Sequence, residues 1–522
     1  MTSDSGYPSL EDEQYNAYVG RIARGAGISL AGQGIGRVLN YATQIALAWM
    51  YGPAQLGLYI LGLTLVQMTN VAAQFGMDNG AVRYVAHYRA EEDVPRVRGT
   101  ILLALWAPLA LSLVLAALMF FGADFLAGSL YNKPSLELVI RVFSISLPLY
   151  TLMNMALYAT VGFQTVKQLI FVQQVAQPLT NLALIIIFYL LGAQILGAVA
   201  AYIVSVLVGS LLALYYLRRM FPGLINREIP ARFETWGLFN ASWPLILSSF
   251  TQRINSWTAV NVLGIFATAS AVGIYNTAAR TAMLSALVLF AFNGIFSPII
   301  SSLYRSGLRD DLNRLYQDVS RWVFAGGLAV FIVTVVLGKD ILAVLGPGFV
   351  SGWMALAIIA AAQLFNSSVG PTQRVLAMTR HQKALMIATV GSAIAGVALN
   401  FVLVPVYGIL GAALATAAAI VLMNALTLLS VRRLLGFWPY NRLYVKPVVA
   451  GILATAFVYL GKLGLSLPTG VQTVLVLGPL FLVSYTVLIV IFGLSSSDRQ
   501  LLTALQDAAR RATGRGARSI AE

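Results

Sequence analysis

Cysteine is absent from this chain of 522 residues, and histidine occurs only at His87 and His381. Without cysteine, disulfide bonds and thiolate chemistry are excluded, although this absence does not decide the compartment. Two histidines near expected helix ends do not form a histidine-based metal site. No nucleotide-binding loop or catalytic triad pattern occurs either. We therefore expect no catalytic residues, no metal and no cofactor.

Charge is also scarce, at 10% of residues, whereas 59% of residues are hydrophobic and the mean hydropathy is +0.80. Soluble proteins do not have this composition, but polytopic membrane proteins do. A spanning helix needs about 20 largely apolar residues. Fourteen candidate spans lie at 24–50, 55–80, 99–122, 136–162, 168–191, 195–218, 237–262, 270–300, 319–343, 352–379, 384–405, 408–431, 445–465 and 470–493. The sequence predicts an all-α membrane protein with about 14 transmembrane helices.

The net charge is +15, and the positions of the basic residues follow the expected membrane topology. Most of the 34 Lys and Arg residues fall in the N-terminal tail, the even-numbered loops or the C-terminal tail, which is the positive-inside pattern. We expect a multi-pass protein of the cell inner (cytoplasmic) membrane with both termini cytoplasmic, in contact with membrane lipids and not with nucleic acid. Because residues 1–20 are polar and acidic, we expect no cleavable signal peptide, and the first span serves as signal anchor.

An internal repeat divides the chain. One constant step along the sequence maps Gly57 onto Gly273 and Tyr59 onto Tyr275, and a slightly shorter step maps Arg218-Arg219 onto Arg432-Arg433. The repeat predicts two parallel six-helix bundles plus two extra C-terminal helices. The predicted parts are a flexible cytoplasmic tail (1–20), an N-terminal bundle (21–219), a cytoplasmic inter-bundle loop (220–236), a C-terminal bundle (237–434), two additional helices (435–494) and a basic cytoplasmic tail (495–522). Tyr59 and Tyr275 are expected in the aromatic belts.

The step that relates Gly57 to Gly273 also relates two arginines at the middle of apolar spans, Arg37 and Arg253. An arginine at the centre of a membrane helix costs roughly 2.5–3.5 kcal/mol on insertion scales. Asp78, near the cytoplasmic end of the second span, is the only acidic residue well inside a predicted span, so the sequence shows no internal counter-ion for these arginines. A guanidinium with its fork of donors suits an external phosphate or carboxylate. Asp78 is a candidate for ion coupling.

Polar side chains at helical spacing accompany these arginines. The first span carries Gln33, Arg37, Asn40 and Gln44 on one face, the second Gln67, Asn70, Gln74 and Asp78, and the eighth Asn276 and Arg280. The fifth span offers Gln173, Gln177 and Asn181. A single amide is as a rule a packing contact, but stripes of this length need dense interhelical hydrogen bonds or an aqueous cavity. The candidate substrate-binding residues are Arg37, Arg253, Arg280, Gln33, Asn40, Gln44, Gln67, Asn70 and Asn276.

Two stretches, YGPAQLGLYILGLTLVQMTNVAAQFGMDNGAVRYVAHYRAEED at 51–93 and ALNFVLVPVYGILGAALATAAA at 398–419, resemble the polysaccharide transporter (oligosaccharide flippase) branch of the multidrug/oligosaccharidyl-lipid/polysaccharide exporter superfamily. The resemblance covers about residues 20–465. It implies a V-shaped pair of bundles, alternating access and a cationic central cavity, whose first- and seventh-helix arginines are matched by Arg37 and Arg253. The first helix carries one central arginine and not a cluster, so lipid II itself is not the expected substrate.

The resemblance implies a flippase that moves a polyprenyl-pyrophosphate-linked oligosaccharide to the outer leaflet for surface polysaccharide biosynthesis, functions as a monomer and is not an enzyme. The alternative within the superfamily is a multidrug/ion antiporter, against which the missing buried carboxylates count. A membrane glycan polymerase or ligase would need a large external loop, and no predicted loop is long enough. A structural scaffold would leave the repeated arginines unexplained.

Overall fold

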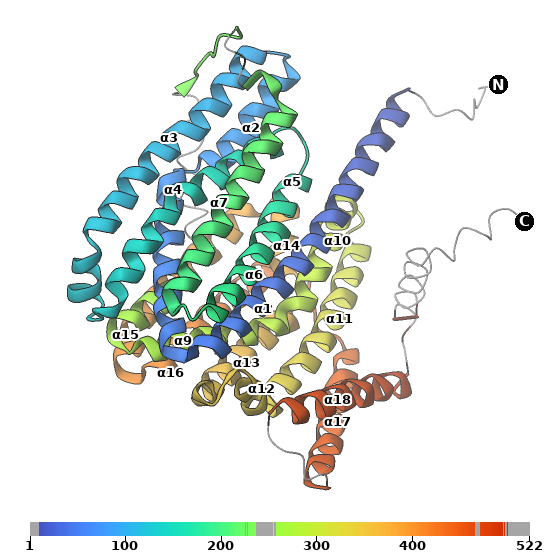
Figure 1. The fold of residues 1–522 in the computed structure, drawn as a ribbon. Coiled ribbons are helices and arrows are strands. Elements are labelled where there is room, and N and C mark those ends of the chain that lie inside the picture. The colour runs from blue at the N-terminus through green and yellow to red at the C-terminus, as the bar shows by residue number, and fades with distance from the viewer. Residues whose placement is uncertain are drawn as a thin grey trace, which may run out of the picture. The chain divides into compact units, whose positions relative to one another are not determined.

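The computed structural model describes residues 10–224, 226, 228–235, 254, 257–464, 470–493, 495 and 498–499, with the backbone alone at 10–31, 291, 294, 295, 298 and 461–464. All regular secondary structure in these ranges is helical (Figure 1). Runs of apolar residues without a period-2 alternation favour helix throughout, because a helix satisfies its own backbone hydrogen bonds inside a bilayer.

The helices of the first half follow the predicted spans closely. They are α1 (Leu10–Gln74), α2 (Met77–Ala90), α3 (Val94–Phe121), α4 (Ser135–Val161), α5 (Lys167–Ile170), α6 (Gln177–Leu190) and α7 (Ile195–Met220). A π-helical turn, η2 (Phe171–Ala176), joins α5 to α6 without a break. Short π and 3-10 turns also lie at η1 (Phe125–Leu130) and η3 (Pro222–Leu224).

The second half contains the remaining elements. The helices are α9 (Ala269–Ala282), α10 (Leu287–Arg305), α11 (Arg309–Val336), α12 (Gly338–Leu345), α13 (Trp353–Val369), α14 (Thr372–Met378), α15 (Gln382–Tyr407), α16 (Ile409–Leu435), α17 (Val445–Gly464) and α18 (Val471–Ile491). The 3-10 turns are η4 (Met283–Ala286), η5 (Pro347–Gly352) and η6 (Arg442–Tyr444).

Eleven helices of the described residues are long and apolar enough to cross a membrane. The first of them, Gly32–Gln74, contains most of the two spans predicted at 24–50 and 55–80. The seventh predicted span, 237–262, lies largely outside the described residues, and its described end is the short apolar helix Trp257–Phe266. The all-helical membrane fold is therefore confirmed, and the count of fourteen stays a prediction.

A kink divides α1 into two arms. Gly52 has φ +70° and ψ 178°, and Pro53 follows it. Glycine adopts a positive φ without a Cβ clash, and proline supplies no N–H to continue the helical ladder. The two arms therefore point in different directions, and polar residues from both can face one space.

Contacts group the chain into two compact units. The first unit comprises Met1–Arg280, Leu345–Ala355 and Thr389–Ala419, and the second comprises Thr281–Val344, Leu356–Ala388 and Ile420–Glu522. Within the first unit α4 packs between α3 and α7, as Figure 1 shows. Within the second unit α17 and α18 pack on each other and on α11 around Ala450, Ala454 and Phe481. The domain boundaries proposed from the sequence stay a prediction.

Two glycines that the repeat relates pack against each other in the first unit. A Cβ on Gly57 would lie 1.7 Å from the carbonyl oxygen of Ala269, and a Cβ on Gly273 would lie 2.1 Å from that of Pro53. Both values are far below any real contact, so the second arm of α1 and α9 approach backbone to backbone. Two glycines that the sequence repeat relates therefore lie at one helix contact, while the layout of two repeated bundles stays a prediction.

The sequence places Tyr59 and Tyr275 in the aromatic belts, and this assignment is wrong. Both side chains are only 3% exposed. The Tyr59 ring packs edge-on against Phe143, and the Tyr275 hydroxyl shares a hydrogen bond of 2.7 Å with the hydroxyl of Thr416. A buried tyrosine needs a hydrogen-bond partner for its hydroxyl. Here the partner comes from the protein interior and not from the membrane–water interface.

Candidate functional site

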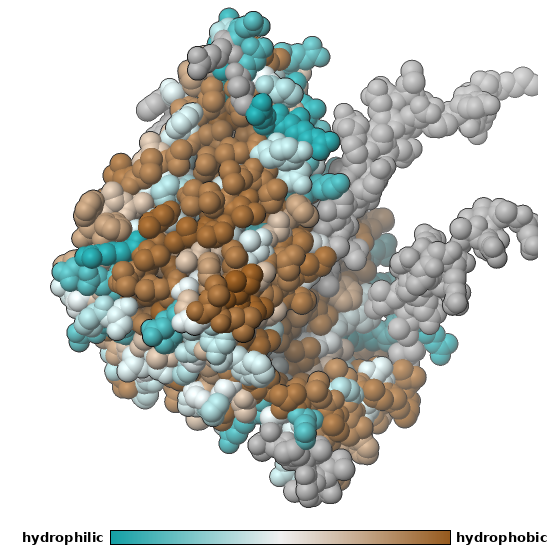
Figure 2. All heavy atoms as spheres, viewed as in Figure 1, coloured by the Kyte–Doolittle hydropathy of each residue, from teal (hydrophilic) through white to brown (hydrophobic). Residues whose placement is uncertain are grey.

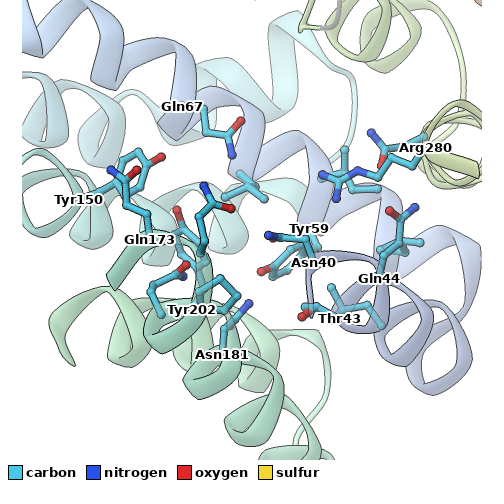
Figure 3. A pocket seen from close by; sticks show the side chains of 18 of the residues that line it. Asn40, Thr43, Gln44, Tyr59, Gln67, Tyr150, Gln173, Asn181, Tyr202 and Arg280 are labelled. Atoms are coloured by element: carbon cyan, nitrogen blue, oxygen red, sulfur yellow. The ribbon is translucent and has the colours of Figure 1, made fainter. Parts of the chain in front are cut away.

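A cavity of about 280 Å³ lies inside the first unit, and several helices contribute to its wall (Figure 3). The first arm of α1 contributes Asn40, Thr43, Gln44 and Leu47; the second arm Leu56, Tyr59, Ile60, Leu63 and Gln67; α4 Tyr150 and Met153; η2 and α6 Gln173, Gln174, Gln177, Pro178 and Asn181; α7 Tyr202; and α9 Asn276 and Arg280. The polar part of this wall consists of amides, tyrosine and threonine hydroxyls and one guanidinium, without a carboxylate.

The irregular parts of the backbone bring these side chains together. The kink at Gly52 turns the two arms of α1 so that both Gln44 and Gln67 reach the cavity. The π-helical turn at Phe171–Ala176 widens the helix, and it carries Gln173 and Gln174. π-bulges inside α-helices occur frequently at functional sites. The cavity is thus built by departures from regular helix.

Hydrogen bonds hold some of the cavity amides, and other amide oxygens are buried without a hydrogen-bond partner among the described residues. Gln44 Nε2 donates to Thr277 Oγ1 at 3.3 Å, and Gln173 Nε2 donates to Asn154 Oδ1 at 2.7 Å. The side-chain oxygens of Gln44, Asn181 and Asn276 are buried and have no hydrogen-bond partner among the described residues. Leaving a buried acceptor without a donor costs about 1–3 kcal/mol. A ligand that brings hydroxyl donors would remove this cost.

Arg280 supplies the charge of the cavity. Its side chain remains accessible although it lies on α9 between neighbouring helices. Figure 3 shows the guanidinium directed into the cavity on the side of Gln44, opposite Tyr150 and Gln173. Arg280 forms no ion pair with any residue that the structure describes. Its guanidinium interacts electrostatically with the Tyr59 side chain. An accessible guanidinium without a carboxylate partner has the charge and the fork of donors that an anion requires.

Five of the substrate-binding residues proposed from the sequence line this one cavity: Asn40, Gln44, Gln67, Asn276 and Arg280. They come from the two arms of α1 and from α9, which lies in the second half of the chain. The helical spacing on the first and eighth spans correctly placed Asn40 beside Gln44 and Asn276 beside Arg280 on one face each. Whether these residues bind substrate stays a proposal.

Among the other proposed residues, Arg37, Gln33 and Asn70 lie outside the cavity wall. Arg37 is half-buried and Gln33 is exposed, and neither is part of the cavity wall. Arg37 precedes Asn40 by three positions and so shares its helix face. Asn70 is buried and accepts a hydrogen bond of 2.9 Å from Thr151 Oγ1, which ties α1 to α4. Arg253 lies outside the described residues.

Asp78, the proposed ion-coupling residue, lies in the first turn of α2 and is 9% exposed. Its Oδ1 atom has no hydrogen-bond partner among the described residues. It forms no ion pair with Arg83 in the described structure. A carboxylate at a helix N-terminus is stabilised by the helix dipole. Asp78 is not part of the cavity wall.

Several cavity residues were not proposed from the sequence as substrate-binding: Thr43, Tyr59, Tyr150, Gln174, Tyr202, and the polar residues of the fifth span. Gln173, Gln177 and Asn181 were visible as a polar stripe, which was the available signal. Gln174 lies within the π-helical turn, which no ordinary helical periodicity predicts. Tyr150 and Tyr202 lie in largely apolar helices, to which the sequence analysis assigned no polar stripe.

Among the described residues there is no group of three or more His, Cys, Asp or Glu side chains that could hold a metal ion.

The chain resembles known proteins in sequence. Residues 22–304 match the family described as Polysaccharide biosynthesis protein. A probable flippase, AglR, of Haloferax volcanii is 30% identical over 179 residues, which are 33% of this chain and 36% of the relative's length. Stage V sporulation protein B of Bacillus subtilis is 24% identical over 441 residues, 79% of this chain and 84% of the relative. The matched segment therefore spans little more than a third of the Haloferax relative.

Solved structures share its fold at low sequence identity. The lipid II flippase MurJ in an inward closed conformation superposes with a TM-score of 0.72 at 14% identity, covering 88% of this chain and 98% of MurJ. A multidrug resistance transporter of the MATE family, in an inward-facing conformation, superposes with a TM-score of 0.66 at 17% identity, covering 79% of this chain and 98% of the transporter. At these identities the likeness concerns the fold alone.

Proposed function

Because this chain belongs to the polysaccharide biosynthesis protein family, we propose that it is a flippase that moves a polyprenyl-pyrophosphate-linked oligosaccharide from the cytoplasmic to the outer leaflet. It is a multi-pass membrane protein, and two of its curated relatives are named as flippases. Translocation breaks no covalent bond, so the proposal requires no catalytic residues. The oligosaccharide would serve surface polysaccharide biosynthesis, and the protein would act in the inner membrane.

The observation that carries the proposal is the composition of the cavity wall. One accessible guanidinium, Arg280, stands among amides and hydroxyls without a carboxylate. A pyrophosphate needs a cation with several donors, which arginine supplies, and sugar hydroxyls need both donors and acceptors, which amides supply. The unpaired oxygens of Gln44, Asn181 and Asn276 are acceptors for such hydroxyls. In the proposal Arg280, Arg37 and Arg253 bind the pyrophosphate.

The remaining proposed residues contact the sugar. Asn40, Gln44 and Gln67 face the cavity and hydrogen-bond sugar hydroxyls, with Asn276 beside Arg280. Gln33 and Asn70 are the members of the proposed set least suited to this role, because Gln33 is exposed outside the cavity wall and Asn70 is already bonded to Thr151. The glycan is then released by alternating access, in which two bundles rock about the bound headgroup. The protein acts as a monomer.

A multidrug/ion antiporter is the second candidate, because a MATE transporter shares the fold. A cationic drug needs a carboxylate in its binding cavity, since a buried charge must be paired. The cavity contains a guanidinium in that place, which repels cations. The composition of the cavity therefore favours the anionic lipid-linked glycan.

The test is the variant Arg280→Gln, compared with Arg280→Lys. A charge-assisted hydrogen bond contributes about 1.5–3 kcal/mol, so loss of the charge should reduce flipping about ten- to a hundredfold. Lysine keeps the charge without the fork and should retain an intermediate rate. The measurement is translocation of a fluorescent undecaprenyl-pyrophosphate-linked oligosaccharide in proteoliposomes.

The exposed Arg309, outside the cavity wall, gives the matched control Arg309→Gln, which should flip at the wild-type rate. Wild-type rates for Arg280→Gln, or efflux of a cationic dye in place of lipid flipping, would overturn the proposal.

We further propose Asp78 as the residue that couples transport to an ion gradient, on the ground of its burial and its unpaired oxygen. Asp78→Asn should flip lipid at a rate that no longer responds to an imposed proton or sodium gradient, while substrate binding is kept. A variant whose rate follows the gradient as the wild type does excludes Asp78 from coupling. The same proteoliposomes provide the measurement.

A further inference from the structure

A second cavity lies where α7 ends. It measures about 510 Å³ and is lined by Tyr215, Arg218, Arg219, Pro222 and Asn226. Both arginine side chains are exposed, and neither has an ion pair or a hydrogen bond with any residue in the described ranges. The acidic residues of the described part of the adjoining loop, Glu228 and Glu234, are exposed, and the Glu228 N–H donates to the Asn226 side-chain oxygen at 3.0 Å. The cavity thus contains two guanidinium groups without a carboxylate partner.

The loop that follows α7 is held against α3 by hydrogen bonds to its backbone. Arg98 on α3 donates from Nε to the Leu224 carbonyl at 3.2 Å and from Nη1 to the Ile229 carbonyl. The Arg232 N–H donates to the Pro95 carbonyl at 3.1 Å. Gly99 allows the Arg232 backbone to approach α3 closely, because a Cβ there would lie 1.9 Å from the Arg232 oxygen. Since α3 fixes the loop in this way, the cavity is preformed.

An apolar stripe leads along α7 to this cavity. Its members share one helix face at the spacing i, i+3, i+7 and i+11, and they are Val204, Leu207, Leu211 and Tyr215, exposed at 37%, 40%, 59% and 55%. On a spanning helix such exposed apolar side chains face lipid. Figure 2 shows a broad hydrophobic surface over α3, α4 and α7, with hydrophilic residues at the upper end, where α7 terminates. The cavity and the stripe share Tyr215.

The repeat-related pair of arginines in the second half is arranged differently. Arg432 and Arg433 occupy the last turn of α16, as Arg218 and Arg219 do on α7. The Arg432 guanidinium lies 4.5 Å from the ring centroid of Trp438, within the range of a cation–π contact. Arg432 therefore already has a partner inside the chain. The positive-inside rule explains both basic pairs, but it does not explain why one of them borders an open cavity.

We propose that this cavity binds the phosphate headgroup of an anionic phospholipid, with Arg218 and Arg219 on the phosphate and an acyl chain along the stripe from Tyr215 to Val204. The guanidinium fork fits phosphate oxygens, and anionic lipids gather at basic residues near the membrane surface. The apolar stripe favours a lipid over free phosphate, because only a lipid has an acyl chain that can pack on it. This site is separate from the cavity around Arg280, so it stands or fails independently of the flippase proposal.

The experiment uses the full-length protein, purified and reconstituted in nanodiscs of phosphatidylcholine with a minor share of phosphatidylglycerol. Phosphatidylglycerol retained by the protein is counted by native mass spectrometry. The double variant Arg218→Gln/Arg219→Gln should retain about tenfold less phosphatidylglycerol than the wild type. The control Arg432→Gln/Arg433→Gln removes the same charge at the equivalent repeat positions and should retain the wild-type amount. A melting curve in pure phosphatidylcholine establishes that each variant is folded.

Equal retention by the two double variants, whether high or low, overturns the proposal, because it shows that specific headgroup binding does not occur at α7. A second arm separates lipid from free phosphate. Leu211→Ser interrupts the apolar stripe and leaves both arginines, so it should reduce phosphatidylglycerol retention severalfold. If Leu211→Ser has no effect, or if millimolar inorganic phosphate displaces phosphatidylglycerol completely, the apolar stripe does not contribute to binding. The assignment to a phospholipid is then wrong.

Discussion

At the level of single residues, some charged side chains of this membrane protein form ion pairs within the described chain and others do not. Arg280 has no carboxylate partner in the described structure and faces a polar cavity. Arg321 on α11 is 4% exposed, yet it contacts Asp318 at 3.1 Å and Asp498 at 2.7 Å. Burying a charge is tolerated when it is paired. The charge of Arg321 is therefore paired within the chain, whereas Arg280 is the arginine that we propose for ligand binding.

Asp498 fastens the segment after α18 to α11. Its carboxylate accepts hydrogen bonds from Arg321 and from Trp322 Nε1, the latter at 2.7 Å, and from the Ser495 N–H at 2.9 Å. The Asp498 N–H in turn donates to Ser495 Oγ at 3.2 Å, which forms a reciprocal capping box. Partial burial alone would raise the pKa of the Asp498 carboxyl, but these hydrogen bonds and the Arg321 charge outweigh it and lower the pKa.

We expect Asp498→Asn to destabilise the second unit. Breaking a buried ion pair costs about 3–5 kcal/mol, and the value should lie at the lower end because Asp318 remains beside Arg321. A lowered folded-state pKa contributes stability that is present above the unfolded pKa of about 3.9 and is lost as pH falls through the folded pKa. The melting temperature in detergent should therefore differ between wild type and variant at neutral pH, and the difference should shrink below the unfolded pKa and vanish below the folded pKa. An unchanged melting temperature at neutral pH contradicts the assignment.

At the level of helices, close approach of backbones decides which elements pack together. Gly57 on the second arm of α1 and Gly273 on α9 occupy equivalent repeat positions and lie in mutual contact. Small residues let membrane helices approach within van der Waals contact of their backbones, where dispersion and weak hydrogen bonds stabilise the pair. The kink at Gly52 begins the arm that makes this contact.

Substituting Gly57→Ala or Gly273→Ala should separate the two helices. The new Cβ would meet backbone atoms, which cannot rotate away, so we expect a destabilisation of about 1–3 kcal/mol, as for overpacking. Gly391→Ala on α15 is the control, because a Cβ there meets no atom within 4 Å and should leave stability unchanged or slightly higher. Thermal unfolding of the purified variants measures both. Wild-type melting temperatures for the α1 and α9 variants would exclude the close contact.

At the level of the whole molecule, the distribution of basic residues predicts the orientation in the membrane. The absence of cysteine makes single-cysteine labelling direct. Ser129 lies in an exposed turn after α3, and Ser306 lies exposed between α10 and α11. These two positions are predicted on opposite faces, with Ser306 and the N-terminal tail inside.

A membrane-impermeant maleimide should label Ser129→Cys in spheroplasts with an intact inner membrane, and it should label Ser306→Cys and Ser3→Cys only after permeabilisation. The physical reason is that basic loops are retained on the cytoplasmic side during insertion. The cysteine-free wild type is the blank. Labelling of Ser306→Cys in intact spheroplasts would reverse the proposed topology and place both termini outside.

Local spacing along the chain was enough to predict the helical membrane fold, since an unbroken apolar run of about 20 residues fits a spanning helix and is too long for a spanning strand. The same spacing relates Gly57 to Gly273 in the sequence repeat, and it places Asn40 with Gln44, and Asn276 with Arg280, on one helix face each. These features follow from the order of the amino acids within one segment and do not depend on what the segment contacts. They needed no knowledge of neighbouring helices.

Which polar faces meet, by contrast, depends on packing between distant segments. Gln67 and Asn70 share a helix face, yet Gln67 lines the cavity and Asn70 bonds to Thr151. That choice depends on the rotation of α1 beyond its kink and on the packing of α4 against it. The π-helical turn that brings Gln174 to the cavity and the burial of Tyr59 likewise follow from interhelical packing. A periodicity identifies a face, but the neighbour that the face contacts is set by contacts between segments far apart in the chain.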